Sequence, residues 1–452
     1  MDWTADQGRA LDRIQEWFRE VGKPGAGWCN ADHSSGGVDE GEWHTHPVTV
    51  PAPAMSLGGY AGSGKTTLVK ALKKLLGVQI AYATPTHKAA GVLRKKIAEV
   101  SDEEASKVRT IHSMIYKTTP FDRCKLSGVL LTEKPRTCSC PLEECEHPRI
   151  YVTPCKDGVS HECAVDRELK FERRQYLHGQ VDLVVLDESS MLSTDMVTDM
   201  CAFGIPILLV GDHGQLSPVK AQMNPWMKSP EIRLESIVRQ GAGSGILTAA
   251  MEVRQTGRPL DYGWYGKECK VVRKNDPSVK ELLDRMTPGS NGQALLVPTN
   301  KLRAMFNTAF HGDGPVRVGE KIIALQRIDA HVLGEDGIMN GQVTVNNGSV
   351  GVVEGVKKVF AKRIHMVVRM ENGTRVLADA AREQFGAEGN LMRNQTPPGT
   401  QLWDYAYALT VHKAQGSEWP HVVVFGEPWT DYGRWTYTAL TRASEGVVMV
   451  RN

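Results

Sequence analysis

Several features that define whole classes of protein are missing from this sequence. No run of about 18 apolar residues occurs in its 452 residues, so no helix is expected to span a membrane. The first residues, MDWTADQGRALDRIQEWF, are amphipathic and acidic early on, unlike a secretory signal peptide. The formal net charge is only +2, which does not exclude nucleic acid, because a basic groove can coexist with an acidic surface. The length predicts about three domains of roughly 100–200 residues each.

Cysteine is scarce outside one segment. Six of the nine cysteines fall within residues 124–163, and the other three, Cys29, Cys201 and Cys269, are scattered. In a chain without a secretion signal, clustered cysteines favour a metal site over a disulfide framework. Reduced cysteines packed as small apolar side chains are the alternative. The candidate ligands are Cys124, Cys138, Cys140, Cys145, His147, Cys155, His161 and Cys163.

A tetrahedral Zn²⁺ site needs four of these ligands. We favour the four cysteines Cys138, Cys140, Cys155 and Cys163, with Cys145 or His147 as the substitute. A metal would supply the folding free energy that such a short, polar segment lacks. A second metal site is conceivable in residues 23–50, but a flexible surface loop is the favoured interpretation there. Its candidate ligands are Cys29, His33, His44 and His46.

Residues 59–66, GYAGSGKT, form a complete phosphate-binding loop of the pattern GxxxxGK[ST]. Lys65 is placed to reach the β- and γ-phosphates, and Thr66 offers a hydroxyl to Mg²⁺. Ala54–Leu57 predicts a strand before the loop and Thr67–Leu76 a helix after it, so a phosphate would lie at a helix N-terminus. A chance glycine-rich turn is the alternative. The nucleotide contacts expected here are Gly59, Gly62, Ser63, Gly64, Lys65, Thr66 and Thr67.

Two carboxylates follow the next apolar run. Residues 183–191, LVVLDESSM, predict a buried parallel strand that ends in Asp187 and Glu188. The carboxyl ends of strands are where open α/β sheets bind ligands. Asp187 is placed to hold Mg²⁺ through water, and Glu188 to orient and deprotonate the attacking water. A solvated strand end is the alternative interpretation.

Two further segments have the same character. Residues 79–90, QIAYATPTHKAA, and 205–219, IPILLVGDHGQLSPV, each predict a strand with a polar end. Asp212 and Gln215 in the second segment are positioned to sense the γ-phosphate. Four strands ending in polar residues along one edge indicate a RecA-like ATPase core.

The motifs DESSM, GDHGQLSPV, TVHKAQGSEW and YTALTRA occur in an order that resembles superfamily 1 DNA helicases of the RecD/Dda-like 5′→3′ branch, of the phage type. The resemblance covers Gln7 to Arg442. It implies an α/β fold with two RecA-like P-loop NTPase domains. It further implies an SH3-like β-barrel insertion in the second domain. In the first domain, family members carry a small subdomain with a wedge-like hairpin; here that segment departs from the family, because it is longer and cysteine-rich, and we expect it to be a small zinc insertion. The domain ranges are 1–120 with 176–230, 121–175 (the insertion), 231–312 with 402–452, and 313–401 (the barrel).

The resemblance also assigns nucleotide contacts outside the loop. Gln7 would read the adenine edge, with an exposed helix residue as the alternative. Arg239 would approach the γ-phosphate, and Arg442 would be an arginine finger delivered by the second domain, so that hydrolysis depends on closure of the cleft. Gln415 and Glu418 would link the nucleotide to that domain. The expected catalytic residues are Lys65, Glu188, Gln215, Arg239 and Arg442.

By the same resemblance, single-stranded DNA would be held on another face. Short hydroxyls, imidazoles and backbone N–H groups suit phosphate contacts that read no bases. A structural role for each histidine is the alternative, but Thr and His recur together three times. The expected DNA contacts are Thr84, Pro85, Thr86, His87, Lys88, Thr110, His112, Thr410 and His412.

The second half of the chain changes character twice. Residues 294–309 predict a strand, a polar turn and a helix of the second RecA-like sheet. Residues 316–378 alternate in hydrophobicity and predict β-structure, with turn signals at 340–342 (NGQ) and 346–351 (NNGSVG). This region resembles the SH3-like barrel that closes over the DNA channel in the family, with a spacer that makes no contacts as the alternative. The return to the RecA-like sheet is expected at about Leu402.

The sequence therefore predicts a monomeric, cytoplasmic helicase, in the host cytoplasm if phage-encoded. It would use ATP and Mg²⁺, carry Zn²⁺, and act on single-stranded and forked duplex DNA, with replication or recombination proteins as further partners. The 5′→3′ polarity rests on the resemblance alone. Two alternatives are a translocase that strips proteins from DNA without unwinding, and a nucleotide-gated DNA-binding module that recruits partners.

Overall fold

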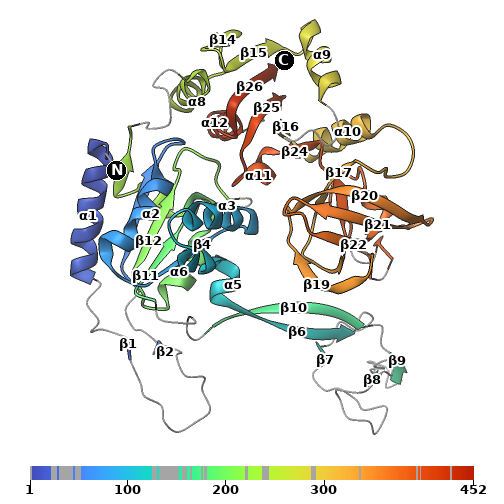
Figure 1. Ribbon diagram of the computed structural model, residues 1–452, viewed down its shortest axis with the longest axis horizontal. Helices are drawn as coiled ribbons and strands as arrows, with labels where there is room; N and C mark the ends of the chain where they lie inside the picture. Colours follow the sequence, from blue (N-terminus) through green and yellow to red (C-terminus); the bar gives the residue numbers. More distant parts are fainter. Residues whose placement is uncertain are drawn as a thin grey trace.

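The arrangement of the chain in a computed structural model is shown in Figure 1. The residues that the structure describes are 3–21, 28–29, 44–45, 52–124, 130–131, 152–154, 160–162, 165–174, 177, 181–218, 222–236, 244–286, 292–334, 337–392, 395–397, 399–427 and 430–452.

The first sheet is six-stranded and entirely parallel, in the order β13-β3-β12-β11-β4-β5. Strands β11 and β12 are fully buried apolar runs, as expected for a sheet covered on both faces. Its strands are β3 (Ala54–Gly59), β4 (Ile80–Thr84), β5 (Val108–Thr110), β11 (Leu183–Leu186), β12 (Ile207–Gly211) and β13 (Ile232–Leu234).

Helices cover both faces of this sheet and form a core on each side. Helices α1, α2, α3 and α4 contribute to one core, and α5, α6 and α7 to the other. Their bounds are α1 (Ala5–Val21), α2 (Lys65–Leu76), α3 (His87–Ala98), α4 (Asp102–Ser106), α5 (Ile111–Ile115), α6 (Thr194–Cys201) and α7 (Pro225–Lys228), with the 3₁₀ turn η1 (Ser189–Met191).

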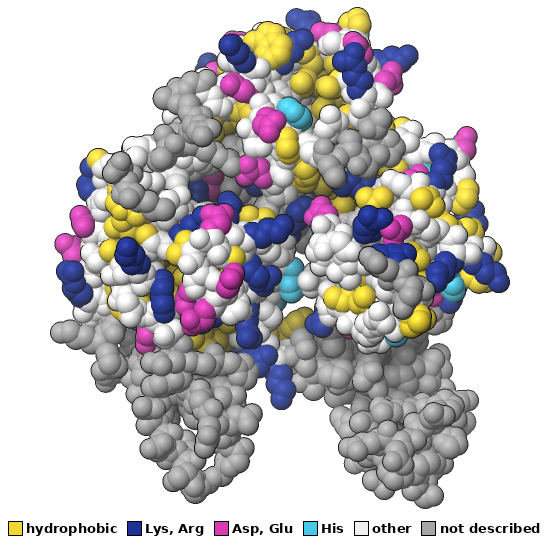
Figure 2. Space-filling model, in the orientation of Figure 1, with side chains coloured by type: hydrophobic (Ala, Val, Ile, Leu, Met, Phe, Trp, Pro, Cys, Tyr) yellow, Lys and Arg dark blue, Asp and Glu magenta, His cyan; other side chains and the backbone are white. Residues whose placement is uncertain are grey.

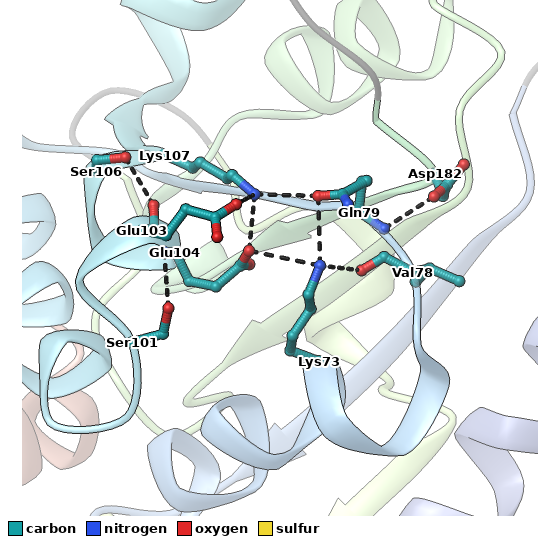
Figure 3. A network of polar contacts seen from close by, with 9 residues as sticks. All are labelled: Lys73, Val78, Gln79, Ser101, Glu103, Glu104, Ser106, Lys107 and Asp182. Atoms are coloured by element: carbon teal, nitrogen blue, oxygen red, sulfur yellow. Dashed lines mark hydrogen bonds and ion pairs between the residues drawn. The ribbon is translucent and has the colours of Figure 1, made fainter.

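A buried polar network fastens α2 and α4 to the amino ends of β4 and β11 (Figure 3). The buried Glu104 carboxylate pairs with Lys107 at 2.7 Å and with Lys73 at 3.5 Å. Lys107 also donates to the Gln79 side chain, and the Gln79 N–H donates to Asp182 at 2.8 Å. Because these contacts join helices to strands at the edge opposite the phosphate-binding loop, the network is structural.

The second sheet has the order β14-β15-β26-β25-β16-β24, and all of its pairs are parallel except β14 with β15. The strand, turn and helix expected in residues 294–309 are present as β16 and α10. Its elements are α8 (Gly245–Thr256), β14 (Gly263–Tyr265), β15 (Cys269–Arg273), α9 (Pro277–Arg285), β16 (Gln293–Val297), α10 (Asn300–His311), β24 (Ala408–Thr410), α11 (Val411–Ala414), β25 (Trp419–Phe425), α12 (Tyr432–Leu440) and β26 (Ala443–Arg451).

A seven-stranded antiparallel sheet lies between β16 and β24 in the sequence, in the order β19-β18-β22-β21-β20-β17-β23. It packs around its own apolar core. Its elements are β17 (Lys321–Ala324), β18 (Ile328–Leu333), β19 (Met339–Val345), β20 (Val350–Val359), β21 (Arg363–Met370), β22 (Arg375–Ala381), the 3₁₀ turn η2 (Arg382–Gln384) and β23 (Trp403–Tyr405).

Two expectations for this region need correction. The predicted turn at 340–342 is wrong, because these residues lie inside β19. Gln342 pairs with His331 of β18, and Gly341, with a positive φ of 86°, lies where the register of the pairing shifts. The chain also returns to the parallel sheet later than residue 402, because β23 still pairs with β17 and the return is made by β24. The turn at 346–351 is present: the Ser349 N–H donates to the Asn346 carbonyl between β19 and β20.

A long antiparallel hairpin leaves the first sheet after α5 (Figure 1). It pairs β6 (Tyr116–Cys124) with β10 (Val165–Arg173), and β7 (Leu130–Leu131) adds to β6. The other short pairs are β1 (Trp28–Cys29) with β2 (His44–Thr45) and β8 (Val152–Pro154) with β9 (Ser160–Glu162). Among the described residues, no helix is long and apolar enough to cross a membrane.

Candidate nucleotide site

The phosphate-binding loop joins β3 to α2, as the sequence predicts. Gly62 and Gly64 have φ values of 80° and 83°, which side chains rarely tolerate. A Cβ at Gly59 would lie 2.4 Å from the Ser63 hydroxyl, so glycine is also required there. Helix α2 begins at Lys65, directly after the loop, and its N-terminal N–H groups face the position for a phosphate.

The Lys65 ammonium lies against its own loop. It donates to the Gly59 carbonyl at 2.6 Å and to the Tyr60 carbonyl at 2.9 Å. A lysine held by two neutral carbonyl oxygens can exchange them for phosphate oxygens, which form stronger charge-assisted bonds.

The two carboxylates lie at the carboxyl end of β11. The Glu188 N–H donates to Asp187 Oδ1 at 2.9 Å, and Glu188 adopts a left-handed φ of 54°. Burial raises the pKa of both groups, and the Asp187 charge raises the pKa of Glu188 further. Lys65 and Arg442 act in the opposite direction on Glu188. A strained residue with a raised pKa and a buried Oε2 that has no hydrogen-bond partner is typical of a catalytic position.

The segment after β12 adds a third acidic side chain. Asp212 is fully buried, accepts a hydrogen bond from the Gly214 N–H at 2.9 Å, and receives a longer one from Gln215 Nε2 at 3.4 Å. Gln215 Oε1 is buried and has no partner. An unpartnered amide oxygen beside the phosphate loop is a group that can accept a hydrogen bond from an ordered water.

A cleft of about 670 Å³ separates the two parallel sheets and is lined by residues of both. This volume is within the range of small-molecule sites. The first sheet contributes the loop, the two carboxylates, and Asp212 and Gln215. The second sheet contributes residues at the start of α8 and residues that follow α11 and α12. The polar residues of the second sheet that line the cleft are Ser244, Ser417, Glu418, Thr441, Arg442 and Ser444.

Arg442 lines this cleft from the second sheet. Its guanidinium is only 7% exposed and donates to the carbonyls of Thr438 at 3.1 Å and Ser417 at 3.2 Å, and to the Thr441 hydroxyl at 3.3 Å. Neutral partners hold the side chain in place without cancelling its charge, which lowers the pKa of Glu188. A fixed, uncompensated cation facing buried carboxylates is suited to stabilise negative charge.

The remaining predicted nucleotide residues differ in position. Gln7 is buried rather than exposed and donates to the Ser63 carbonyl at 3.2 Å, so it supports the phosphate loop from behind. Gln415 is buried at the contact between the sheets and donates to the Leu216 carbonyl at 3.3 Å. Glu418 lines the cleft. Arg239 lies outside the described residues.

Sequence reasoning missed two groups at this site. Lys96 of α3 lines the cleft and lowers the pKa of Asp187, but nothing distinguishes it from other helix-surface lysines. Tyr437 lies in the YTALTRA motif, where only the arginine was interpreted, and its hydroxyl contacts both Asp212 and the phosphate loop.

The predicted DNA contacts have a common local structure. Thr86, Thr110 and Thr410 are the N-caps of α3, α5 and α11, and each hydroxyl accepts a backbone N–H of the helix that it starts. Thr84 donates to the Thr86 carbonyl. The hydroxyl oxygens of these threonines therefore cap helices. The hydroxyl protons of Thr86 and Thr410 can still be donated to another acceptor.

His87 and Lys88, two basic residues of this set, lie close to residues of other elements. Burial lowers the pKa of His87, and the charges of Arg327, Arg94 and His112 lower it further. The Lys88 ammonium lies 5.0 Å from the centre of the Trp419 ring. Lys, Arg and His side chains gather around the hollow between the first sheet and the antiparallel sheet (Figure 2). Like charges held close together favour binding of an anion.

The favoured zinc ligands, Cys138, Cys140, Cys145, Cys155 and Cys163, all lie outside the described residues. Among the residues that the structure does describe, no cluster of three or more metal-binding side chains occurs. Cys201 and Cys269 are buried free thiols.

The fold and the cleft define a P-loop nucleotide-binding protein. Residues 45–276 match the family model of the AAA domain, and residues 405–450 match that of the UvrD-like helicase C-terminal domain. The chain belongs to the AAA-domain family.

The known proteins that the chain resembles are distant from it in sequence. The ATP-dependent RecD2 DNA helicase of Deinococcus radiodurans is 26% identical over 419 residues, which are 86% of this chain and 46% of the relative. The human DNA replication ATP-dependent helicase/nuclease DNA2 is 24% identical over 166 residues, 36% of this chain and 14% of the relative. The chain thus spans less than half the length of either.

Among solved structures, Bacteroides Pif1 bound to ssDNA is 16% identical, with a TM-score of 0.44, and the alignment covers 99% of this chain and 92% of that chain. A structure described as two coordinating Pif1 helicases at forked dsDNA has 16% identity and a TM-score of 0.47 over the same shares.

Proposed function

We propose that this chain is an ATP-dependent DNA helicase that moves 5′→3′ along single-stranded DNA and couples ATP hydrolysis to duplex unwinding. One observation carries the proposal: a single cleft brings the phosphate loop and two carboxylates of one sheet together with a fixed guanidinium of another. A site divided in this way is complete only when the two sheets are close, so nucleotide turnover can alternate with their movement.

The donor set of the cleft fits a magnesium nucleotide. Three polar atoms of cleft-lining residues are buried without a partner, namely Glu188 Oε2, Gln215 Oε1 and Ser417 Oγ. Groups of this kind are costly to bury unless a ligand or water satisfies them. Thr66 and Asp187 would hold Mg²⁺, which would neutralise charge on the phosphates.

Within the cleft, each residue has a distinct role in this proposal. Lys65 exchanges its carbonyl partners for the phosphates, and the loop N–H groups hold their oxygens. Glu188 orients the attacking water and removes its proton, which its raised pKa favours. Gln215 positions that water, and Arg442 stabilises the charge that develops on the transferred group. Arg239, Gln415 and Glu418 retain the contacts that the resemblance assigns to them.

We place the DNA strand in the hollow between the first sheet and the antiparallel sheet. The cationic and hydroxyl groups there are suited to the phosphate backbone rather than to the bases. The antiparallel sheet would act as the SH3-like element that closes the channel, and the hairpin of β6 and β10 would carry the insertion that separates strands. We therefore propose that the chain consists of four parts: two RecA-like domains, the cysteine-rich insertion and the SH3-like barrel.

For the cysteine-rich insertion we propose one Zn²⁺ per chain, because thiolates of this number and spacing suit tetrahedral coordination. Elemental analysis of protein purified without chelators should show one zinc, and the Cys138→Ser, Cys140→Ser double variant should lose it. The AAA-domain core should stay folded in that variant, and ATP turnover should persist. Metal-free wild-type protein would contradict the proposal.

The direct test of the function uses forked duplexes with a single 5′ or 3′ tail. The 5′-tailed fork should be unwound in the presence of ATP and Mg²⁺, the 3′-tailed fork should not, and Lys65→Ala should unwind neither. ATP turnover that depends on DNA, with no unwinding of either fork, would instead support a translocase that displaces bound proteins. ATP-dependent DNA binding without turnover would support the recruitment module.

A further inference from the structure

We propose that Tyr437 is a positioning residue whose hydroxyl fastens the phosphate-binding loop and the Asp212 segment to the helix that precedes Arg442. Tyr437 belongs to α12 of the second sheet, whereas both of its partners belong to the first. The hydroxyl donates to Asp212 Oδ2 at 2.7 Å and accepts the Ala61 N–H at 2.8 Å. One oxygen atom therefore links three segments across the cleft. The inference rests on the proposed ATP hydrolysis for its catalytic consequence, but not for its geometry.

The position of the hydroxyl is tightly determined. Tyr437 and Asp212 are both fully buried. The Tyr437 ring packs edge-on against the Tyr60 ring of the phosphate loop, with centroids 6.0 Å apart. A Cβ at Gly214 would lie 3.1 Å from Tyr437, from Tyr60 and from Asp212 alike, so a larger residue there would make these neighbours shift by a few tenths of an ångström.

The helix that carries Tyr437 is also fixed on its other side. Gly433 packs against α8 so closely that a Cβ there would lie 3.1 Å from the Val253 carbonyl oxygen. Thr438, which follows Tyr437 in α12, accepts the Leu216 N–H at 3.0 Å. A second hydrogen bond therefore joins α12 to the first sheet. Moving α12 away from the first sheet must therefore break the Tyr437 bonds.

The chemistry of the phenol suits this role. Burial and the neighbouring Asp212 charge raise the pKa of Tyr437 well above its usual range, so the hydroxyl remains a donor at every working pH. Arg442 lies five positions after Tyr437, just beyond the end of α12, and its guanidinium is held by the Thr438 carbonyl of that helix. When the hydroxyl is bonded, Gln215, the loop and Arg442 are set in one arrangement. When the cleft opens, all three are released together.

The test is Tyr437→Phe, which removes one oxygen atom and keeps the ring. Hydrogen exchange of the apo protein is read in the peptide that contains Ala61. Loss of its acceptor should speed exchange of this amide at least tenfold in the variant. Tyr405→Phe, which alters a buried tyrosine in the antiparallel sheet, is the matched control and should leave that peptide unchanged. Unchanged exchange in Tyr437→Phe would overturn the inference.

The second arm measures ATP turnover with and without single-stranded DNA. Tyr437→Phe should lower kcat by about 10–100-fold and reduce the stimulation by DNA, while KM changes less than about threefold. Gly214→Ala, which keeps the hydroxyl but displaces it, should do the same. Equal turnover in wild type and Tyr437→Phe would overturn the positioning role. A wild type without any turnover would refute the proposed function, whereas the exchange arm would still decide the contact.

Discussion

The two parallel sheets have the same number of strands but bring different chemistry to the cleft between them. The first supplies a phosphate loop, three acidic side chains and a lysine. The second supplies a guanidinium, the Glu418 carboxylate, hydroxyls and the phenol of Tyr437. In the proposed function, the first sheet holds the phosphates and the attacking water. The second sheet adds the cation that stabilises the transferred group.

This division explains why the site can respond to movement. The groups of the first sheet sit on loops that follow adjacent parallel strands, so they stay on one sheet when the second sheet moves. Arg442 is held only by groups of its own sheet. Substitution of Lys65 in the phosphate loop should therefore affect binding as well as chemistry, whereas substitution of Arg442 should affect chemistry alone. The predictions below test that contrast, from the largest expected effect to the smallest.

Lys65→Ala should reduce ATP hydrolysis to the assay background, because no other cation of the loop reaches the β- and γ-phosphates. Binding of single-stranded DNA should be largely unaffected, since the strand is expected on another face. Turnover and DNA binding measured on the same preparation check this. Turnover within tenfold of wild type would show that the loop does not hold the nucleotide.

Arg442→Ala should lower turnover by roughly 10³–10⁵-fold, the contribution typical of an arginine finger. ATP affinity should fall much less, because the phosphate loop is intact. Stopped-flow or filter-binding titrations together with steady-state turnover check this. Arg434→Ala, which removes a cation of α12 that donates to Ser217 instead, is the matched control and should keep most of the activity.

Glu188→Gln should bind ATP normally but hydrolyse it about 10²–10⁴-fold more slowly, because the amide keeps the shape and cannot accept the proton. A variant that turns over at the wild-type rate would assign the base elsewhere.

The same variant should also be more stable than wild type at neutral pH. Burial raises the folded-state pKa of Glu188 above its unfolded value, so ionisation costs stability once the pH exceeds the unfolded pKa, and fully above the folded one. Removing this ionisation cost should raise Tm by roughly 2–4 °C for each kcal/mol of stability gained. Thermal melts of the apo protein should show this gain near neutral pH and lose it on acidification below the unfolded pKa. An equal gain at both pH values would contradict the electrostatic cause.

Affinity for single-stranded DNA should fall as salt rises. Each phosphate that is neutralised contributes a slope of about −0.7 in log K against log salt. Replacing Lys88 by Ala should reduce the magnitude of the slope by roughly this amount, whereas replacing the distant Lys228 should not. A slope near zero in log K against log salt would contradict binding through contacts with the DNA phosphates.

Much of the cleft could be predicted from sequence because its first half is built from short, contiguous motifs. The glycine spacing of the loop and the carboxylates after an apolar run are local signals of a strand, a turn and a helix start. The role of Tyr437 gives no such signal, because its hydroxyl contacts Ala61, which lies 376 residues away.

The predicted turn at 340–342 failed for a different reason. Asn-Gly is a strong turn signal, but Met339 and Gln342 on either side of it pair with β18. Asn340 and Gly341 form an irregularity within the strand instead, which accommodates the positive φ of Gly341. The buried position of Gln7 likewise depends on packing of α1 against the loop, which composition cannot show.

The most direct test of the divided site is to titrate ATP into Lys65→Ala and Arg442→Ala side by side and to measure turnover of both with single-stranded DNA. The account predicts that Lys65→Ala loses both affinity and turnover, while Arg442→Ala retains affinity close to wild type and loses turnover. If Arg442→Ala lost affinity as completely as Lys65→Ala, Arg442 would be a ground-state binding residue. The two sheets would then not divide binding from chemistry.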